Sequence, residues 1–365
     1  MKIEITPLDT LFFKDAKAFN MEDETWADSF FPPYPSVLYG ALRTVYFANH
    51  VDELDKATTK QDPTRNLVIK NISYKIYENR NSFLGYYYPC PFSLVQLKNR
   101  NVNQKNRENR RKIYSVTGLK NTNKKFVSSS NLEYFFMNNL EVENISNGII
   151  EKSDLEMFLQ GYTEELKIRK LEDLILSENK IGIRINNNTN SVKNECLYRM
   201  NMLRMDKVKI CIEFEGLNIP STGFIKLGGE SKSCSYKEIQ NNEELYEYSL
   251  KGQKFKLYLA TPAIFKNGWI PSWIDKNSLE GEYKGINVKL LSVCMGKTQY
   301  VGGYDIKNGC PKKMMKAVPA GSVYCFELQS GTLEEVTNLF NGKSIAELDF
   351  AKQGFGISFV GNWEE

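Results

Sequence analysis

The sequence has 365 residues, a formal net charge of +4, and hydrophobic and charged fractions of 41% and 25%, as in a soluble globular protein long enough for two domains. Its seven cysteines never form a CxxC pair, and His50 is its single histidine. This composition argues against a disulfide framework, a zinc knuckle, a multi-histidine metal site and a histidine-dependent triad. We therefore expect no catalytic residue, no metal and no cofactor. The absence of a signal-peptide pattern and of an apolar stretch of membrane length predicts a cytoplasmic protein.

The N-terminal residues predict a short strand over residues 2–5, because Ile3 and Ile5 alternate with charged residues. A loop with Lys14 follows, and then an acidic loop over residues 22–28. Clustered carboxylates can bind a metal, but these have no ligand spacing, so a solvated loop is the better interpretation.

The stretch Ser29–Arg43 reads SFFPPYPSVLYGALR and predicts an extended approach followed by a helix. Its three prolines disfavour helix in the residues before them, and Ser36 is the expected N-cap. From Leu38 onward apolar residues recur at helical spacing. The free amides of a helix N-terminus, together with Ser36 and Arg43, would suit a phosphate. An ordinary capped core helix has the same pattern, and on these residues alone it is favoured.

The segment over residues 51–180 is rich in Asn, Lys and Glu and has weaker apolar periodicity. Strands are predicted over residues 67–77 and 92–97, and an amphipathic helical region over residues 154–176. Between them, Lys98–Lys125 carries ten basic residues and one acid. Such a block repels itself unless a polyanion or an acidic partner orders it. A flexible insertion and a nucleic-acid-binding arm are both open.

After residue 180 the strand pattern becomes clearer. Alternating isoleucines predict a strand over residues 181–185 with Arg184 on the opposite face, and residues 207–214 predict another. The pair Gly228–Gly229 then permits a close backbone approach, with Lys226 and Lys232 beside it. By itself this is equally well a tight turn.

The last third of the chain predicts strands over residues 255–260, 287–294 and 323–328, and a helix over residues 333–340. Between the second and third strands, Lys297 and the Gly302–Gly303 pair lie close to Tyr300 and Tyr304. Cations beside aromatic rings on loops suit unpaired nucleic acid, whose phosphates need charge and whose bases stack on rings.

The order of these elements predicts an α+β fold made of two ferredoxin-like, RRM-like βαββαβ units. The first unit is expected over residues 1–215, with a large insertion at about residues 51–180, and the second over residues 216–365. A sheet of this kind often receives single-stranded RNA.

Six motifs, taken in order, resemble a known family. They are ITPLDTLFFKD, FFPPYPSVLYGALR, KIGIRI with LYRM, LGGE, YVGGYDI with AVPAGSVY, and the closing GFGISFVGNW. Together they resemble the RAMP-superfamily subunit that caps the 5′ tag of CRISPR RNA in the Cmr-type (type III-B) effector complex. The resemblance spans the chain except residues 51–180.

The resemblance implies a non-catalytic subunit in antiviral defence whose partners are the 5′ tag of CRISPR RNA, the large polymerase/cyclase-like subunit and the backbone RAMP subunit. It implies a glycine-rich closing loop, matched here by Gly354 and Gly356. The residues that it and the local chemistry together suggest for RNA binding are Lys14, Ser36, Gly40, Arg43, Arg184, Lys226, Gly228, Gly229, Lys232, Lys297, Gly302, Gly303, Gly354 and Gly356.

Two other functions stay open at this point. One is a RAMP-type endoribonuclease that processes CRISPR RNA with tyrosine or lysine in place of histidine. The other is a purely protein-binding scaffold. The basic stretch Lys98–Lys125 would be a thumb-like hairpin, a clamp on an acidic partner, or an untethered loop.

Overall fold

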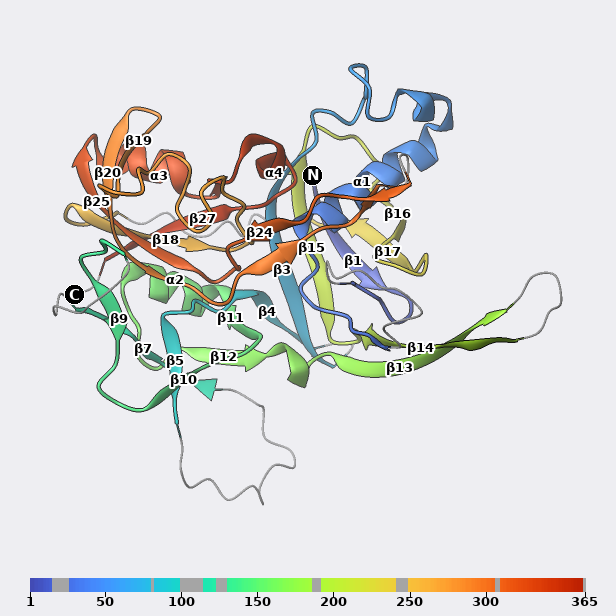
Figure 1. The fold of residues 1–365 in the computed structure, drawn as a ribbon, viewed down its shortest axis with the longest axis horizontal. Coiled ribbons are helices and arrows are strands. Elements are labelled where there is room, and N and C mark those ends of the chain that lie inside the picture. Colours follow the sequence, from blue (N-terminus) through green and yellow to red (C-terminus); the bar gives the residue numbers. More distant parts are fainter. Residues whose placement is uncertain are drawn as a thin grey trace.

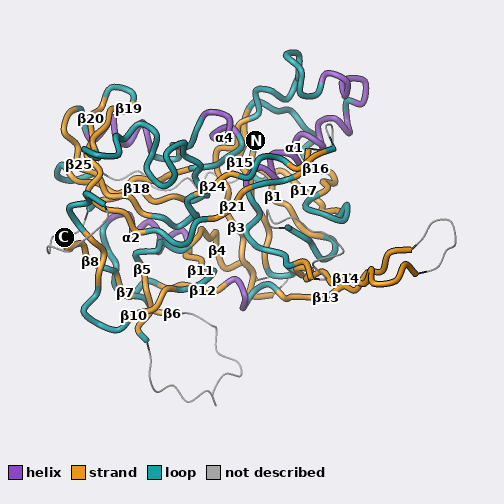
Figure 2. Tube along the Cα trace, in the orientation of Figure 1, coloured by secondary structure: helices purple, strands orange, loops and turns teal. Residues whose placement is uncertain are grey.

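The computed structural model shows an α+β protein in which strands predominate and helices are few (Figures 1 and 2). The predicted α+β class is therefore confirmed. The structure describes residues 1–14, 26–79, 82–98, 114–122, 130–185, 192–240, 249–305 and 309–363.

A nine-stranded sheet organises the first half of the protein. Its strands, in spatial order, are β16 (Thr222–Lys226), β17 (Ser233–Glu238), β1 (Lys2–Pro7), β15 (Val208–Glu215), β3 (Val68–Asn79), β4 (Ser82–Pro89), β11 (Gly148–Glu151), β12 (Lys167–Lys170) and β6 (Tyr114–Ser115). Alternation in β1 buries Ile3 and Ile5 completely in the core, whereas Lys2 and Glu4 lie on the opposite face.

Helix α1 (Pro35–Asn49) packs on the core face of this sheet through Leu38, Leu42 and Val45. The prediction that Ser36 caps this helix is wrong. The helix begins at Pro35, so its N-cap is Tyr34, two residues before Ser36, and the Tyr34 side chain makes no capping hydrogen bond. Proline is well suited to the first helical position because its φ is already helical and it has no amide to leave unpaired. A 3₁₀ helix, η1 (Val51–Lys56), follows.

A six-stranded sheet organises the second half. Its strands, in spatial order, are β19 (Glu280–Tyr283), β20 (Ile286–Cys294), β25 (Val323–Ser330), β18 (Lys254–Leu259), β27 (Ile357–Asn362) and β26 (Lys343–Ser344). Helix α3 (Leu333–Phe340) begins with a capping box between Thr332 and Glu335. The short helix α4 (Leu348–Lys352) precedes the closing strand.

The central strands of both sheets have the spatial order of a βαββαβ unit, but each half contains one of its two helices. In the first sheet, residues 216–232 lead from β15 to β17 through β16 without a helix. In the second, residues 260–285 lead from β18 to β20 without a helix. Complete ferredoxin-like units therefore go beyond what the structure shows and stay a prediction.

The predicted domain limits need correction. β16 and β17 lie after residue 215, yet they extend the first sheet, because β17 pairs with β1. The expected insertion over residues 51–180 contains β3 and β4, of which β3 pairs with the central strand β15. The strand predicted over residues 67–77 is β3, but its sequence does not show that it pairs with β15 as part of the main sheet.

The rest of the middle segment forms small sheets and two short helices. These elements are β5 (Leu94–Leu97), β7 (Thr117–Gly118), β8 (Lys120–Thr122), β9 (Phe135–Met137), β10 (Val142–Asn144), α2 (Lys152–Gln160) and η3 (Leu171–Asp173). The predicted helical region over residues 154–176 is thus wrong beyond α2. Gly161 adopts φ +116° at the helix C-cap and ends the helix there.

A long two-stranded ribbon, β13 (Leu176–Ile185) with β14 (Val192–Arg204), extends away from the body (Figure 1). The short strand β2 (Trp26–Ala27) pairs with its base. Four further short strands form two hairpin ladders in the second half: β21 (Gln299–Val301) with β24 (Met315–Ala317), and β22 (Tyr304–Asp305) with β23 (Cys310–Pro311).

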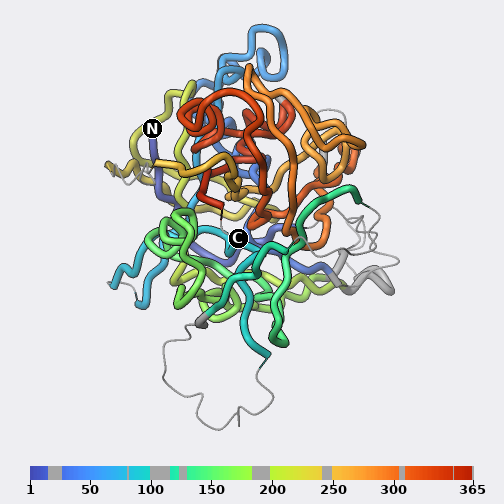
Figure 3. Tube along the Cα trace, turned by 90° about the vertical axis from the view of Figure 1, so that its left-hand side faces the viewer, coloured from blue at the N-terminus to red at the C-terminus, as the bar shows by residue number. Residues whose placement is uncertain are grey.

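One core joins the two halves. The largest buried cluster contains α1 and α2 residues together with Tyr258, Val323 and Phe359 of the second sheet. The Tyr258 hydroxyl donates a hydrogen bond to the Pro89 carbonyl oxygen at 2.5 Å. Figure 3 shows the green middle segment packed beneath the orange and red C-terminal half. Among the described helices, none is long and apolar enough to cross a membrane.

Candidate nucleic-acid interface

The Gly228–Gly229 turn lies directly against the segment that follows β1. The Gly229 amide donates to the Phe12 carbonyl oxygen at 2.8 Å. Gly228 has φ +78°, and a Cβ placed there would lie 2.4 Å from the same oxygen. Both conditions require glycine at residue 228. Lys14 is exposed two residues after Phe12 and bridges to Ser29, and Lys226 is exposed at the end of β16.

Charged side chains connect this turn to the base of the β13–β14 ribbon. Lys232 forms an ion pair with Asp9 at 2.5 Å, and Arg204 of β14 lies 3.8 Å from the same carboxylate. Arg204 also pairs with Glu178 of β13. The hydrogen bond from Lys232, assisted by the Thr10 amide, lowers the pKa of Asp9. The turn, the N-terminal segment and the ribbon are thus one connected surface.

Aromatic contacts extend this surface to the start of α1 and to the second half. The rings of Phe13 and Phe31 have centroids 6.4 Å apart, and those of Phe30 and Tyr34 are 4.5 Å apart. The Tyr34 hydroxyl donates to the Tyr300 carbonyl oxygen at 3.0 Å. The N-terminus of α1 therefore lies beside β21.

The second predicted glycine pair follows immediately after β21. Gly303 is exposed with φ +144°, and Lys297 is exposed just before the strand. The structure thus brings together residues from four separate stretches of the chain. They are Lys14, Ser36, Lys226, Gly228, Gly229, Lys232, Lys297, Gly302 and Gly303.

Gly40 is exposed on α1, and a Cβ built there would have no atom of the described residues within 4 Å. The fold therefore gives no packing reason for glycine at this position, where it costs about 1 kcal/mol of helix stability relative to alanine. A glycine at residue 40 would allow the backbone of a ligand to approach the helix closely.

Arg43 already has a partner within the chain. Its guanidinium pairs with Asp62 at 2.6 Å and donates to the Thr64 hydroxyl at 2.7 Å. Burial by itself would raise the pKa of Asp62, but hydrogen bonds from Thr64 and the Thr58 amide, with the Arg43 charge, lower it. Arg43 thus anchors α1 to the loop before β3.

Gly354 and Gly356 lie in the interior. Gly354 has φ +91°, and a Cβ there would be 2.8 Å from Ile69 of β3; Gly356 has φ +70° and would place a Cβ 2.8 Å from the Ala346 amide nitrogen. Close packing between the halves accounts for Gly354, and a close approach within the second half accounts for Gly356. The structure does not bring them to the surface on which the other residues gather.

Two predictions fall on parts that the structure does not describe. Arg184 lies in β13, but its side chain is outside the described residues. Most of the basic stretch, residues 99–113 and 123–125, is also outside them. Neither prediction is tested.

The sequence argument missed a charged cluster on the sheet face opposite α1. Glu4 is 1% exposed and accepts hydrogen bonds from Lys75 and Lys209, both at 2.8 Å. The Lys75 ammonium lies 5.1 Å from the ring centroid of Phe83. The alternation of charged and apolar residues in β1 predicted this face, but not which strands supply its lysines.

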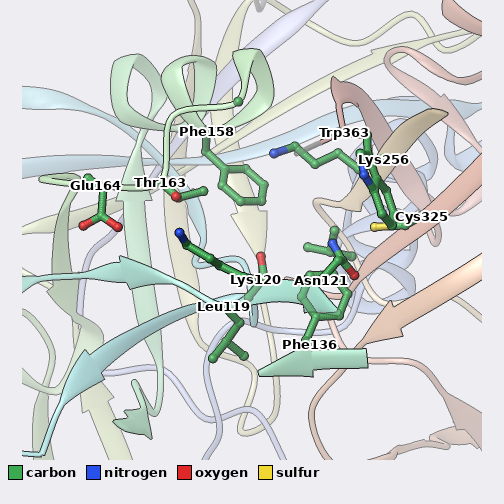
Figure 4. Close-up of a pocket in the computed structure, with 13 residues that line it drawn as sticks. Leu119, Lys120, Asn121, Phe136, Phe158, Thr163, Glu164, Lys256, Cys325 and Trp363 are labelled. Carbon is green, nitrogen blue, oxygen red and sulfur yellow. The ribbon is translucent and has the colours of Figure 1, made fainter. Parts of the chain in front are cut away.

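The sequence argument also missed a pocket between the middle segment and the second sheet (Figure 4). It has a volume of about 250 Å³. Its walls come from β8, β9, α2, β18 and β25, and from Trp363 after β27. No group of three or more metal-ligating side chains occurs among the residues that the structure describes.

Comparison with known proteins gives one family and several solved structures. The family model described as CRISPR-associated protein (Cas_Cmr3) matches residues 3–363. Comparison with curated proteins gives no match.

A chain in the cryo-EM structure of Type III-B Cmr-beta bound to cognate target RNA is similar, with 17% identity and a TM-score of 0.50, over 89% of this chain and 86% of that one. At that identity the likeness concerns the fold alone. A chain in the crystal structure of a Csm3–Csm4 subcomplex of the type III-A interference complex has 13% identity and a TM-score of 0.34, over 90% of this chain and 93% of that one.

Proposed function

This chain belongs to the Cas_Cmr3 family of CRISPR-associated proteins, and from that membership we propose that it is the subunit of a type III-B effector complex that binds the 5′ tag of CRISPR RNA. In this role it joins the large polymerase/cyclase-like subunit to the backbone RAMP subunit and cleaves no RNA itself. The observation that carries the proposal is the connected surface of residues 9–14, the start of α1, the Gly228–Gly229 turn and the loop after β21.

This surface has the parts that a single strand needs. Lys14, Lys226 and Lys297 are exposed around it, and cations there would neutralise phosphates. Gly40 and Gly303 leave the backbone open to close approach. Tyr300 is 49% exposed and offers a ring for stacking. Because the surface draws on both halves, its geometry depends on the complete fold.

The test is the binding of labelled guide RNA, with and without its 5′ tag, to the complex reconstituted with and without this chain. We expect removal of the tag to weaken binding only when this chain is present. The logarithm of the affinity should fall linearly with the logarithm of salt concentration, with a slope of about −0.7 per contacted phosphate. Equal affinity for tagged and untagged RNA would contradict the proposal.

The same reconstituted complexes distinguish the two alternative functions. Specific cleavage of repeat RNA by this chain would indicate an endoribonuclease. Assembly of the complex through this chain, without any change in RNA affinity, would indicate a protein-binding scaffold.

A further inference from the structure

The edge strand β16 exposes an aromatic ring that the core does not use. Phe224 is 74% exposed, the largest fraction among the large apolar side chains of the described residues. Its neighbour Ile225 is 2% exposed and belongs to the main core. Figure 1 shows β16 at one edge of the first sheet. An exposed apolar side chain on an edge strand favours aggregation unless something covers it, so the ring of Phe224 points to a binding partner.

The pairing of the strands places Phe224 on the sheet face opposite α1. Phe224 lies directly opposite Ser235 of β17, and Ser235 lies opposite Thr6 of β1. Residues directly opposite each other share a face, and Thr6 shares its face with Glu4 because side chains alternate along a strand. The neighbour of the ring across the strands is therefore a short serine, which leaves room for a planar group beside the ring.

Cations surround the ring on this face. Lys226 is exposed two residues further along β16, on the same side of the strand. The side chain of Lys237 is 60% exposed, and its ammonium lies 3.8 Å from the Glu4 carboxylate. Lys75 and Lys209 pair with the same carboxylate, so three ammonium groups share one negative charge. The cluster of Glu4 and these three lysines therefore keeps a net positive charge, which attracts phosphates.

The face of Phe224 is continuous with the surface proposed to bind the tag. The Gly228–Gly229 turn begins four residues after Phe224, a distance of about 13 Å along an extended chain. Lys226 lies between them, at the end of β16. A single strand of RNA that contacts the turn can therefore continue along β16 and reach the ring.

We propose that Phe224 stacks on one unpaired base of the guide RNA, next to the nucleotides that contact the Gly228–Gly229 turn. Aromatic side chains on an open sheet face bind single-stranded RNA in this way, with cations on the phosphates. A protein partner fits less well, because an interface between proteins has an apolar core, whereas the cross-strand neighbours of Phe224 are serine and lysine. The inference rests on the proposed RNA-binding function.

Two substitutions distinguish a base contact from a phosphate contact in the reconstituted complex. Phe224→Leu keeps an apolar side chain and removes the ring, so the affinity for labelled guide RNA should fall by about 5- to 100-fold with an unchanged salt slope. Lys226→Met should instead make the salt slope shallower by about 0.7.

Matched variants control for the change at the surface. Phe224→Trp retains a stacking ring and should keep the affinity of the unmodified chain. Tyr162→Leu removes another exposed aromatic ring, 60% exposed and outside the first sheet, and should leave RNA affinity unchanged. Thermal unfolding checks that each variant is folded. Unchanged RNA affinity in Phe224→Leu, or an equal loss in Phe224→Leu and Phe224→Trp, would overturn the proposal.

Photocrosslinking identifies the base. Guide RNA with 5-iodouridine at one position at a time, in the tag or in the rest of the guide, should crosslink to the peptide with residues 222–226 from one position or two adjacent ones. That position shows whether the base belongs to the tag. The absence of this crosslink at every position would contradict the stacking.

The remaining outcomes separate Phe224 from the proposed function. Weaker association of Phe224→Leu with the other subunits in the absence of RNA, at unchanged RNA affinity, would assign the ring to a protein contact and overturn the proposal. Dependence of binding on the tag is measured in parallel with the unmodified chain. If that dependence is present while Phe224→Leu binds RNA normally, the assignment of Phe224 alone is wrong, whereas its absence removes the proposed function.

Discussion

Glu4 shows how one residue can organise a face of the sheet. Its carboxylate is almost completely buried and holds the ammonium groups of Lys75 and Lys209. Burial would raise the pKa of Glu4, but the hydrogen bonds and charges of the two lysines outweigh burial and lower it. The carboxylate therefore stabilises the fold only while it is charged.

Glu4→Gln should lower the free energy of unfolding at pH 7 by about 1–3 kcal/mol, a value reduced from that of a fully buried pair because both lysines are partly exposed. The native pKa is lower than the ordinary value of 4.5, so this contribution is present above pH 4.5 and is lost as the pH falls through the native pKa. Urea unfolding at pH 7 and pH 3 should therefore show a larger difference between variant and wild type at pH 7 than at pH 3. Glu282→Gln, on an exposed strand position, is the control, and a constant difference at both pH values would contradict the interpretation.

The residue type of Arg43 does not by itself determine its interaction partner. A lone cation in a helix is compatible with a phosphate ligand and with an internal ion pair. The partner, Asp62, is 19 residues away in sequence and has no periodic relation to Arg43. Only the path of the loop before β3 brings the two together.

At the scale of elements, two glycines differ in whether the fold requires them. Gly40 of α1 is not required by the surrounding structure, whereas Gly356 is. Gly40 has open space around a Cβ, whereas Gly356 has φ +70° and a backbone nitrogen 2.8 Å from a Cβ. Substitution by alanine is therefore expected to raise the free energy of unfolding at residue 40 and to lower it at residue 356.

Gly40→Ala should raise the free energy of unfolding by about 0.5–1 kcal/mol, because alanine is the better helix former. If the RNA backbone approaches α1 here, the same variant should bind tagged guide RNA more weakly. Gly356→Ala should lower stability by about 1–3 kcal/mol through backbone strain. Thermal unfolding and RNA binding of both variants check this. A Gly40→Ala variant that is more stable and binds RNA equally well would remove Gly40 from the interface.

Many elements were predictable because their periodicity is local. The strands β15, β18, β20 and β25 and helix α3 lie within one or two residues of their predicted ranges, since each buries one alternating or helical face. In the middle segment, the strands predicted over residues 67–77 and 92–97 correspond to β3 and β5. The other strands there are short, and their pairing with distant strands is not visible in the local sequence.

At the scale of the whole molecule, the two halves share a core and a surface. The α+β class followed from the sequence, but the domain limit at residue 215 did not, because nothing local shows that β17 returns to pair with β1. The same long-range contacts place the Gly228–Gly229 turn beside Phe12, and Tyr34 beside Tyr300. Of the predicted binding residues, those near these contacts gather on one surface, whereas Gly354 and Gly356 are buried.

The most direct test of this account is crosslinking of a 5′-tagged guide RNA to the reconstituted complex, followed by mapping of the crosslinked peptides of this chain. We predict crosslinks from tag nucleotides to residues 9–14, the start of α1, the Gly228–Gly229 turn and the loop after β21. Crosslinks confined to Lys98–Lys125 and spread along the whole RNA would contradict it. They would identify a nonspecific clamp and leave tag recognition to another subunit.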